Sequence, residues 1–276
     1  EVGYYENHTK RKVILIIFII LALCAAGLYA SILWNMHEGM VETVAEDEID
    51  EEDLRSDNVP IIEEEKKPNV FHVLLVGADA RNPESENGRS DSMMLISYNV
   101  DENKATVASF MRDSLVEIPG HGQTKLGHSY AYGGVGLTVN TINSVYDLNI
   151  QNYVIINMEN LKNVVDKLGG IEVTLTAAEV AYYQKSKHYF KEGVNHMNGE
   201  QALMHSRNRS LENDFGRTRR QRDVMFAVYQ KVKQTKDPVA LLTIIKYCLT
   251  QVKTNMKIKT EQSRDLLSGL IKNNIK

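Results

Sequence analysis

The sequence predicts an α/β protein with a mixed central β-sheet flanked by helices, preceded by one N-terminal transmembrane helix. Two features carry this prediction. From Val70 onward, strand-like and helix-like segments interleave, as they do in domains whose helices cover a sheet. Residues 13–34 form an apolar run without a charged side chain. Such a run is long enough to cross a hydrocarbon core of about 30 Å.

The apolar run at residues 13–34 is predicted to be an uncleaved membrane anchor. It is longer than the apolar region of a cleavable signal peptide, which spans about 7–15 residues. Cleavage after Ala30 is the alternative. Basic residues 10–12 precede the run and acidic residues dominate after it. The positive-inside rule therefore places the N-terminus in the cytoplasm and residues 35–276 outside the cell.

The segment after the anchor is predicted to be an acidic linker. Residues 37–69 carry thirteen acidic and three basic groups, whereas residues 70–276 carry 26 Lys and Arg against 21 Asp and Glu. Repulsion between like charges favours an extended, solvated segment. The expected parts of the chain are a cytoplasmic tail (1–12), the anchor (13–34), an extracellular linker (35–69) and an extracellular folded domain (70–276).

The folded domain is predicted to begin with three strands. Residues 70–76 and 93–100 are strand-like runs, and residues 105–111 follow across the polar turn residues 101–104, which predicts a hairpin. Further strands are expected at residues 153–157 and 171–175.

Helical periodicity first appears in residues 137–146, where Val139, Ile142, Val145 and Tyr146 are expected on one face. Two capping boxes, Thr176 with Glu179 and Asn198 with Gln201, predict two helix starts. The remaining helices are expected at residues 159–168, 216–234, from Asp237 onward, and 260–272.

Two aspartates stand beside predicted strand ends. Asp79 follows the first strand and Asp91 precedes the second. Ligands of α/β domains often bind at strand ends, and Mg²⁺ usually takes one or two carboxylates together with phosphate oxygens. The pair therefore suggests a divalent cation site. The alternative is that both residues only shape the turns, which aspartate often does.

Six arginines lie within residues 207–222. Steps of three and four place Arg217 and Gln221 on the stripe of a helix that continues into apolar positions, so both are expected to point inward toward the sheet edge. A buried guanidinium needs an anionic partner, and arginine suits bidentate phosphate binding. A solvated basic helix is the alternative. Arg219 and Arg222 face elsewhere and are expected to be solvated surface charges.

Two further cations are candidates for the same site. Arg112 follows the predicted hairpin, and Lys125 lies in the polar loop of residues 122–128. His128 in this loop is expected to be a structural residue. The sequence contains no Walker loop, HExxH or GxSxG motif.

Several long motifs in fixed order resemble the LytR-CpsA-Psr (LCP) family of glycopolymer transferases. The resemblance covers residues 70–236 and is carried by VLLVGADAR, GRSDSMMLISYN, SFMRDSLVEIPG, KLGHSYAYGG, VVDKLGGIEV, MNGEQALMHSRNR and DFGRTRRQR. Several such motifs in order are far more specific than any one of them.

The resemblance implies an LCP-type fold and a phosphotransferase dependent on Mg²⁺ (or Mn²⁺). Such an enzyme moves a glycopolymer from an undecaprenyl-pyrophosphate carrier to peptidoglycan during cell-wall assembly, at the cell membrane of a Gram-positive bacterium. The implied partners are the lipid-linked glycopolymer, the peptidoglycan acceptor and the bilayer, with no nucleic acid. Two alternatives stay open: an envelope-sensing transcriptional attenuator, and a polyprenyl-pyrophosphate hydrolase with the same site.

The resemblance also implies roles for individual residues. Asp79 and Asp91 look like the metal-linked aspartates, and Asp214 like the carboxylate that orients the arginines. The residues implied in catalysis are Asp79, Asp91, Arg112, Arg207, Arg209 and Arg217. Those expected at the pyrophosphate are Arg81, Arg89, Lys125, Asp214, Arg220 and Gln221.

The charge pattern around the anchor predicts a topology that proteolysis can check. Protease added to intact protoplasts is expected to digest residues 35–276, because the basic residues before the anchor hold the N-terminus inside. A cytoplasmic marker protein should survive the same treatment. If residues 35–276 survive in intact protoplasts and disappear only after lysis, the predicted orientation is wrong.

Overall fold

The computed structural model describes residues 45–46, 54, 70–78, 89–99, 101–102, 104–212 and 214–256. All of them belong to the second of two units into which the chain divides, residues 44–276. The predicted tail and anchor at residues 1–34 and the predicted helix at 260–272 lie outside the described residues. No helix among the described residues is long and apolar enough to cross a membrane.

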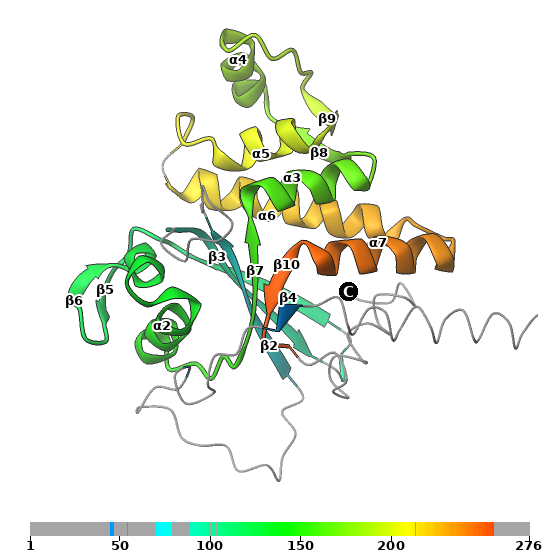
Figure 1. Ribbon diagram of the computed structural model, residues 1–276. Helices are drawn as coiled ribbons and strands as arrows, with labels where there is room; N and C mark the ends of the chain where they lie inside the picture. The colour runs from blue at the N-terminus through cyan, green and yellow to red at the C-terminus, as the bar shows by residue number, and fades with distance from the viewer. Residues whose placement is uncertain are drawn as a thin grey trace, which may run out of the picture. The chain divides into compact units, whose positions relative to one another are not determined.

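A six-stranded mixed sheet forms the centre of this unit, in the order β1-β10-β7-β2-β3-β4 (Figure 1). Strands β2, β3 and β4 are successive antiparallel neighbours, while β2 and β7 run parallel. This confirms the predicted mixed sheet and the predicted hairpin. The strands are β1 (Ala45–Glu46), β2 (Val70–Ala78), β3 (Ser90–Asn99), β4 (Lys104–Phe110), β7 (Asn152–Asn157) and β10 (Val252–Thr254).

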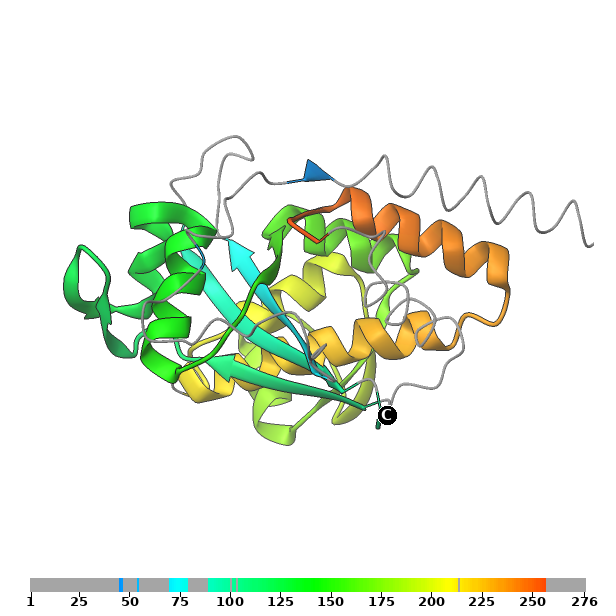
Figure 2. The ribbon, with the colours of Figure 1, turned by 90° about the horizontal axis from the view of Figure 1, so that it is seen from below.

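Helices lie on both sides of the sheet. Figures 1 and 2 place α2 on one side, and α3, α6 and α7 on the other. The helices are the 3-10 helix η2 (Leu126–His128), α2 (Ser129–Tyr146), α3 (Met158–Lys167), α4 (Ala177–Lys185), α5 (Gly199–Arg207), α6 (Asp214–Lys233) and α7 (Pro238–Thr250). Two separate hairpins complete the described elements, β5 (Leu115–Ile118) with β6 (Gly122–Lys125), and β8 (Ile171–Leu175) with β9 (Gly193–Met197).

The local sequence signals explain where most helices begin and end. Both predicted capping boxes are present, at Thr176 before α4 and at Asn198 before α5. Helix α7 follows the predicted cap Asp237, whose carboxylate accepts from the Val239 N–H. Helix α3 ends before Gly169, which adopts a φ of 73° that disfavours other residues.

Helix α2 differs from its prediction in two respects. It begins at Ser129 instead of residue 137, because non-helical angles at Gly133 and Gly134 interrupt the periodicity that the sequence shows. Val139 and Ile142 are buried, but Val145 and Tyr146 are exposed. The predicted face is therefore covered only in the middle of the helix, which ends at Tyr146, where the chain turns through a left-handed Asp147.

Part of the predicted linker at residues 35–69 belongs to the folded unit. Strand β1 pairs in parallel with β10. The Leu54 side chain is buried in the core beside β2 and α2, and its carbonyl accepts a hydrogen bond of 2.9 Å from Asn143 Nδ2. For Leu54 the expectation of a solvated position is wrong.

Candidate functional site

A β-bulge places Asp91 at the edge of the sheet. Gly77 of β2 faces Ser92 of β3, but the next residue, Ala78, faces Ser90, so Asp91 is the extra residue between them. Bulges redirect a side chain and are frequent beside active sites. A Cβ at Gly77 would lie 3.0 Å from the Ser92 Cβ, so glycine allows the two strands to approach here. Asp79, one residue beyond β2, and Arg81 lie outside the described residues.

Two arginines meet the Asp91 carboxylate. Arg112, which follows β4, donates from Nη1 to Asp91 Oδ1. Arg209, which follows α5, approaches the same oxygen from Nη2 at 3.7 Å. The Asp91 side chain is only 13% exposed, so this carboxylate holds two cations at the border of the protein interior. The structure thus brings three predicted site residues together.

Helix α6 supplies the third arginine. Arg217 is 2% exposed and forms an ion pair of 2.5 Å from Nη2 to Asp214 Oδ1. Its Nε and Nη1 have no hydrogen-bond partner among the residues that the structure describes, so Asp214 satisfies only one of the three nitrogens. On the same stripe, Gln221 Nε2 donates to the Asp91 carbonyl at 3.3 Å. The predicted inward direction of Arg217 and Gln221 is confirmed.

The electrostatics of Arg217 indicate an anion site. Burial lowers the pKa of this guanidinium, Asp214 raises it, and the nearby charges of Arg209 and Arg112 lower it further. Arg217 also lies in the first turn of α6, where the helix dipole adds positive potential. Buried polar groups in native proteins almost always have hydrogen-bond partners. An anionic ligand would supply those that Arg217 lacks.

A pocket of about 250 Å³ opens beside these residues. Gly127 closes one wall: its N–H donates to the Arg112 carbonyl at 2.8 Å, and a Cβ there would lie 3.3 Å from the Ser90 carbonyl oxygen. The lining residues are Arg89, Ser90, Arg112, Asp113, Lys125, Gly127 and His128. Three cations predicted for the site therefore line one pocket.

Two pairs of side chains order the loop that forms this wall. Lys125 Nζ lies 3.0 Å from Asp113 Oδ1, and this contact holds the pKa of Asp113 below its usual value despite partial burial. His128 Nδ1 lies 2.9 Å from Thr124 Oγ1, in keeping with the structural role expected for this histidine. Arg207, the last residue of α5, is exposed.

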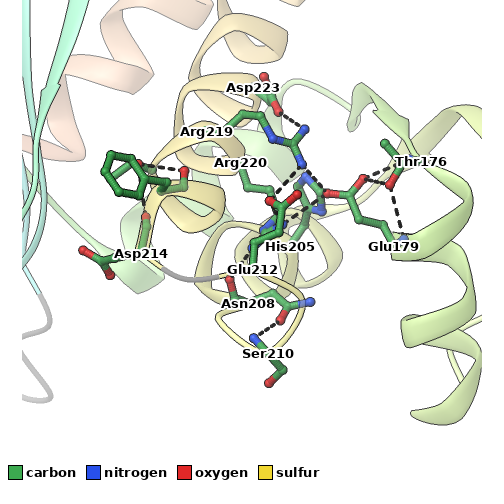
Figure 3. Close-up of polar contacts among 12 residues, drawn as sticks. Thr176, Glu179, His205, Asn208, Ser210, Glu212, Asp214, Arg219, Arg220 and Asp223 are labelled. Atoms are coloured by element: carbon green, nitrogen blue, oxygen red, sulfur yellow. Dashed lines mark hydrogen bonds and ion pairs between the residues drawn. The ribbon is translucent and has the colours of Figure 1, made fainter.

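Arg220 belongs to a second cluster (Figure 3). Its side chain is fully buried, and Nη1 lies 3.3 Å from Glu179 Oε1 and 3.4 Å from Glu212 Oε2. The expectation that Arg220 binds pyrophosphate is therefore corrected: protein carboxylates already neutralise it. Three residues further along α6 than Arg217, it points toward α4 and α5, and Asp214 lies apart from this cluster in Figure 3.

The two arginines expected on the surface also have partners. Arg219 is 38% exposed and lies within 3.5 Å of carboxylate oxygens of Glu179, Glu212 and Asp223. Arg222 is half-buried and donates to Ser109 Oγ of β4 at 2.9 Å. The prediction of solvated surface charges holds only in part: Arg219 is partly exposed but paired with carboxylates, and Arg222 is half-buried against Ser109.

The donor set fits a magnesium ion that also binds phosphate. The described residues contain no group of three or more His, Cys, Asp or Glu side chains placed to hold a metal ion. Mg²⁺ bound to a phosphate needs only one or two protein carboxylates. Asp91 at the bulge is a carboxylate of the right chemistry, and Asp79, the other aspartate expected to hold the ion, lies outside the described residues.

Comparison with known proteins identifies the family. The model of the LytR_cpsA_psr (LytR-CpsA-Psr) family matches residues 36–275. The chain belongs to the LytR-CpsA-Psr family. One LCP relative, from Enterococcus faecalis, is polyisoprenyl-teichoic acid–peptidoglycan teichoic acid transferase TagU. It is 36% identical over 258 residues, which cover 90% of this chain and 78% of the relative.

Solved LCP structures share the fold. Bacillus subtilis TagT is 30% identical with a TM-score of 0.62, over 83% of this chain and 82% of TagT. A structure of TagT with bound octaprenyl pyrophosphate lipid is also 30% identical, with a TM-score of 0.58, over 76% of this chain and 77% of that one. These matches confirm the family resemblance and the sheet flanked by helices.

Arg217 is predicted to be the arginine on which anion binding depends most. Arg217→Ala should weaken the binding of inorganic pyrophosphate about ten- to a hundredfold, since a charge-assisted hydrogen bond contributes about 1.5–3 kcal/mol. Arg217→Lys should retain only part of the wild-type affinity, because an ammonium cannot make the two parallel hydrogen bonds that a planar guanidinium makes to a phosphate. Titration calorimetry measures both. Arg222→Lys on the same helix is the control, and equal losses in all three variants would contradict a defined pocket.

The second cluster contains a buried histidine that should make stability depend on pH. Burial lowers the pKa of His205 from its usual 6.5 to about 4. Between pH 6.5 and about pH 4, the unfolded chain therefore binds more protons than the folded one. The free energy of unfolding falls as the pH falls through this range.

Urea unfolding at pH 7 and pH 4.5 tests this expectation. Between pH 7 and pH 4.5, the free energy of unfolding of wild type should fall by about 2 kcal/mol more than that of His205→Gln, whose side chain does not titrate. The exposed His188→Gln should behave like wild type. Identical losses in wild type and His205→Gln would show that His205 is protonated in the folded state.

Proposed function

We propose that this LCP protein transfers a teichoic-acid-type glycopolymer from a polyprenyl-pyrophosphate carrier to peptidoglycan. The observation that carries the proposal is the buried Arg217 guanidinium, whose Nε and Nη1 have no hydrogen-bond partner among the described residues. Its charge interacts with those of Arg112 and Arg209. A pyrophosphate supplies the charge and the oxygen acceptors that this cluster lacks. The name of the Enterococcus faecalis relative and the lipid bound to TagT support the substrate class.

The reaction is a phosphoryl transfer, in which the protein mainly positions the reacting groups and neutralises charge. Arg217 binds the pyrophosphate from the first turn of α6, and Asp214 orients its guanidinium. Arg112 and Arg209 neutralise the leaving polyprenyl phosphate while Asp91 holds both side chains in place. A sugar hydroxyl of peptidoglycan attacks the phosphorus attached to the glycopolymer, and the bond to the lipid phosphate breaks.

The remaining predicted residues surround these groups. Arg89 and Lys125 attract the diphosphate from the pocket wall, and Arg207 adds a positive charge at the end of α5. A role for Arg81 at the pyrophosphate is carried over from the family motif alone. Asp79 or Asp91 accepts the proton of the attacking hydroxyl. Asp79 and Asp91 would hold Mg²⁺ (or Mn²⁺), which, when bound, neutralises charge on the phosphate oxygens.

A membrane anchor fits this substrate. The polyprenyl chain keeps the carrier in the bilayer, so an enzyme held at the same surface meets it without diffusing from solution. The apolar run at residues 13–34, with basic residues before it, anchors the chain and leaves the domain outside, where peptidoglycan lies.

Transfer by the purified full-length chain in detergent is the test. Wild type should attach glycan from a prenyl-pyrophosphate-linked donor to peptidoglycan fragments, and EDTA should abolish attachment until Mg²⁺ is restored. Asp91→Asn should reduce attachment at least a hundredfold, because it loses the charge that holds Arg112 and Arg209. Mass spectrometry of the fragments measures the product.

Two comparisons complete this test. Asp147→Asn is the matched control, since Asp147 is exposed in a left-handed conformation that asparagine also adopts. Thermal unfolding checks that Asp91→Asn is folded. Release of glycan phosphate without attachment would show a hydrolase in place of a transferase. Full activity of Asp91→Asn in metal-free buffer would disprove the metal assignment.

A further inference from the structure

One buried carboxylate joins helix α4 to helix α6. Glu179 Oε2 accepts from the Thr176 N–H at 2.9 Å and from its hydroxyl at 3.0 Å, which completes the capping box of α4. The other oxygen, Oε1, accepts from Arg219 Nη2 at 3.0 Å and from Arg220 Nη1 at 3.3 Å. The two oxygens of this carboxylate thus accept four hydrogen bonds, which replace the water that a side chain only 3% exposed cannot reach.

The same arginine fixes the point where the chain leaves α5. Arg220 Nη2 donates to the Asn208 carbonyl at 2.9 Å. Asn208 caps α5 with an extended backbone, and its Oδ1 accepts from the Ser210 N–H at 2.9 Å. The residues on either side of it are Arg207 and Arg209. The direction in which these two arginines leave the backbone therefore depends on a carbonyl that Arg220 holds.

We propose that Glu179 and Arg220 are positioning residues that aim Arg207 and Arg209 at the pyrophosphate. The inference rests on the proposed function, since it concerns the same site. Arg209 is a half-exposed side chain that reaches within 3.7 Å of Asp91 Oδ1, and few contacts of its own restrain so long a group. Its placement must come from the backbone, and the backbone is held by the Glu179–Arg220–Asn208 chain (Figure 3).

The geometry of α6 couples this chain to the pocket. Arg220 precedes Gln221, which bonds the Asp91 carbonyl, and follows Arg217 by three residues. The same helix therefore carries Arg217 and Gln221, which face the pocket, and Arg220, which contacts Glu179 and the Asn208 carbonyl. A shift of α6 or of the α5 exit would move the arginines relative to Asp91.

Positioning and direct binding predict opposite effects for one substitution. If Arg220 bound the pyrophosphate itself, removing its competing partner Glu179 would release the guanidinium and tighten anion binding. If Arg220 acts through Asn208, removing the Glu179 charge loosens Arg220 and weakens binding. Glu179→Gln keeps the size of the side chain, but its amide N–H₂ cannot accept from the Thr176 N–H or from an arginine.

The test measures binding of farnesyl pyrophosphate to the full-length chain in detergent by titration calorimetry. Glu179→Gln and Arg220→Lys should each weaken binding about five- to twentyfold. The control Glu172→Gln removes the same charge from an exposed residue of β8 and should stay within twofold of wild type. Thermal unfolding confirms that each variant is folded at the temperature of the titration.

Binding measured in a chain that lacks both positioned arginines distinguishes a positioning role from a purely structural one. In a chain that already carries Arg207→Ala and Arg209→Ala, Arg220→Lys should cause no further loss beyond twofold, because the groups it positions are absent. An undiminished further loss in this background would show that Arg220 acts on the ligand directly or on the whole fold. The comparison also decides the question if Glu179→Gln fails to fold.

The outcomes separate this inference from the proposed function. If wild type does not bind farnesyl pyrophosphate, the proposed function fails, and the positioning role fails with it. If wild type binds and Glu179→Gln binds as tightly or more tightly, only the positioning role is overturned. Weaker binding by both single variants, with no further loss in the double-alanine background, supports it.

Discussion

A guanidinium removed from water needs anions or several hydrogen-bond acceptors around it, because the penalty for burying an uncompensated charge is large. Helix α6 buries two such groups three residues apart and treats them differently. Arg220 is enclosed by Glu179, Glu212 and the Asn208 carbonyl. Arg217 has one carboxylate, Asp214, within ion-pair distance, and no hydrogen-bond partner for its Nε and Nη1 among the described residues. The difference separates a structural charge from a ligand-binding one.

A β-bulge in the sheet brings a carboxylate close to the arginines of the site. Asp91 is one extra residue in β3, and the bulge turns its side chain out of the regular register of the strand pair. A single carboxylate in this position contacts the arginines without neutralising all of them. Asp91 then holds Arg112 directly and leaves Arg209 at 3.7 Å. Three carboxylates then face four cations, so the cluster keeps a net positive charge. The carboxylates are Asp91, Asp113 and Asp214, and the cations are Arg112, Lys125, Arg209 and Arg217.

The parts of the fold that depend on nearby residues follow from the sequence, because their causes lie within a few positions. The capping boxes at Thr176 and Asn198, the end of α3 before Gly169 and the inward stripe of Arg217 and Gln221 are all of this kind. The turn angles and helical period that produce them are local properties of the chain.

The features that the sequence does not reveal depend on distant partners. Arg220 finds Glu179 forty-one residues away, and the Asn143 amide finds the Leu54 carbonyl eighty-nine residues away. A capping box predicts where Glu179 lies along a helix, but not that its second oxygen faces two arginines. The bulge at Asp91 likewise appears only when β2 and β3 are paired, since neither strand alone shows an extra residue.

Three cations gathered around so few carboxylates carry a cost in the free protein. Arg209 and Arg112 both lower the pKa of Arg217, which means that they destabilise its charged form. The surrounding structure must hold the three side chains together against this repulsion, and the contacts of Arg220 with Glu179 and the Asn208 carbonyl lie beside them on the same helix. An anion that enters relieves the repulsion, so its binding energy and the stability of the folded domain are linked. For the proposed diphosphate substrate, this repulsion between the arginines would be relieved on binding.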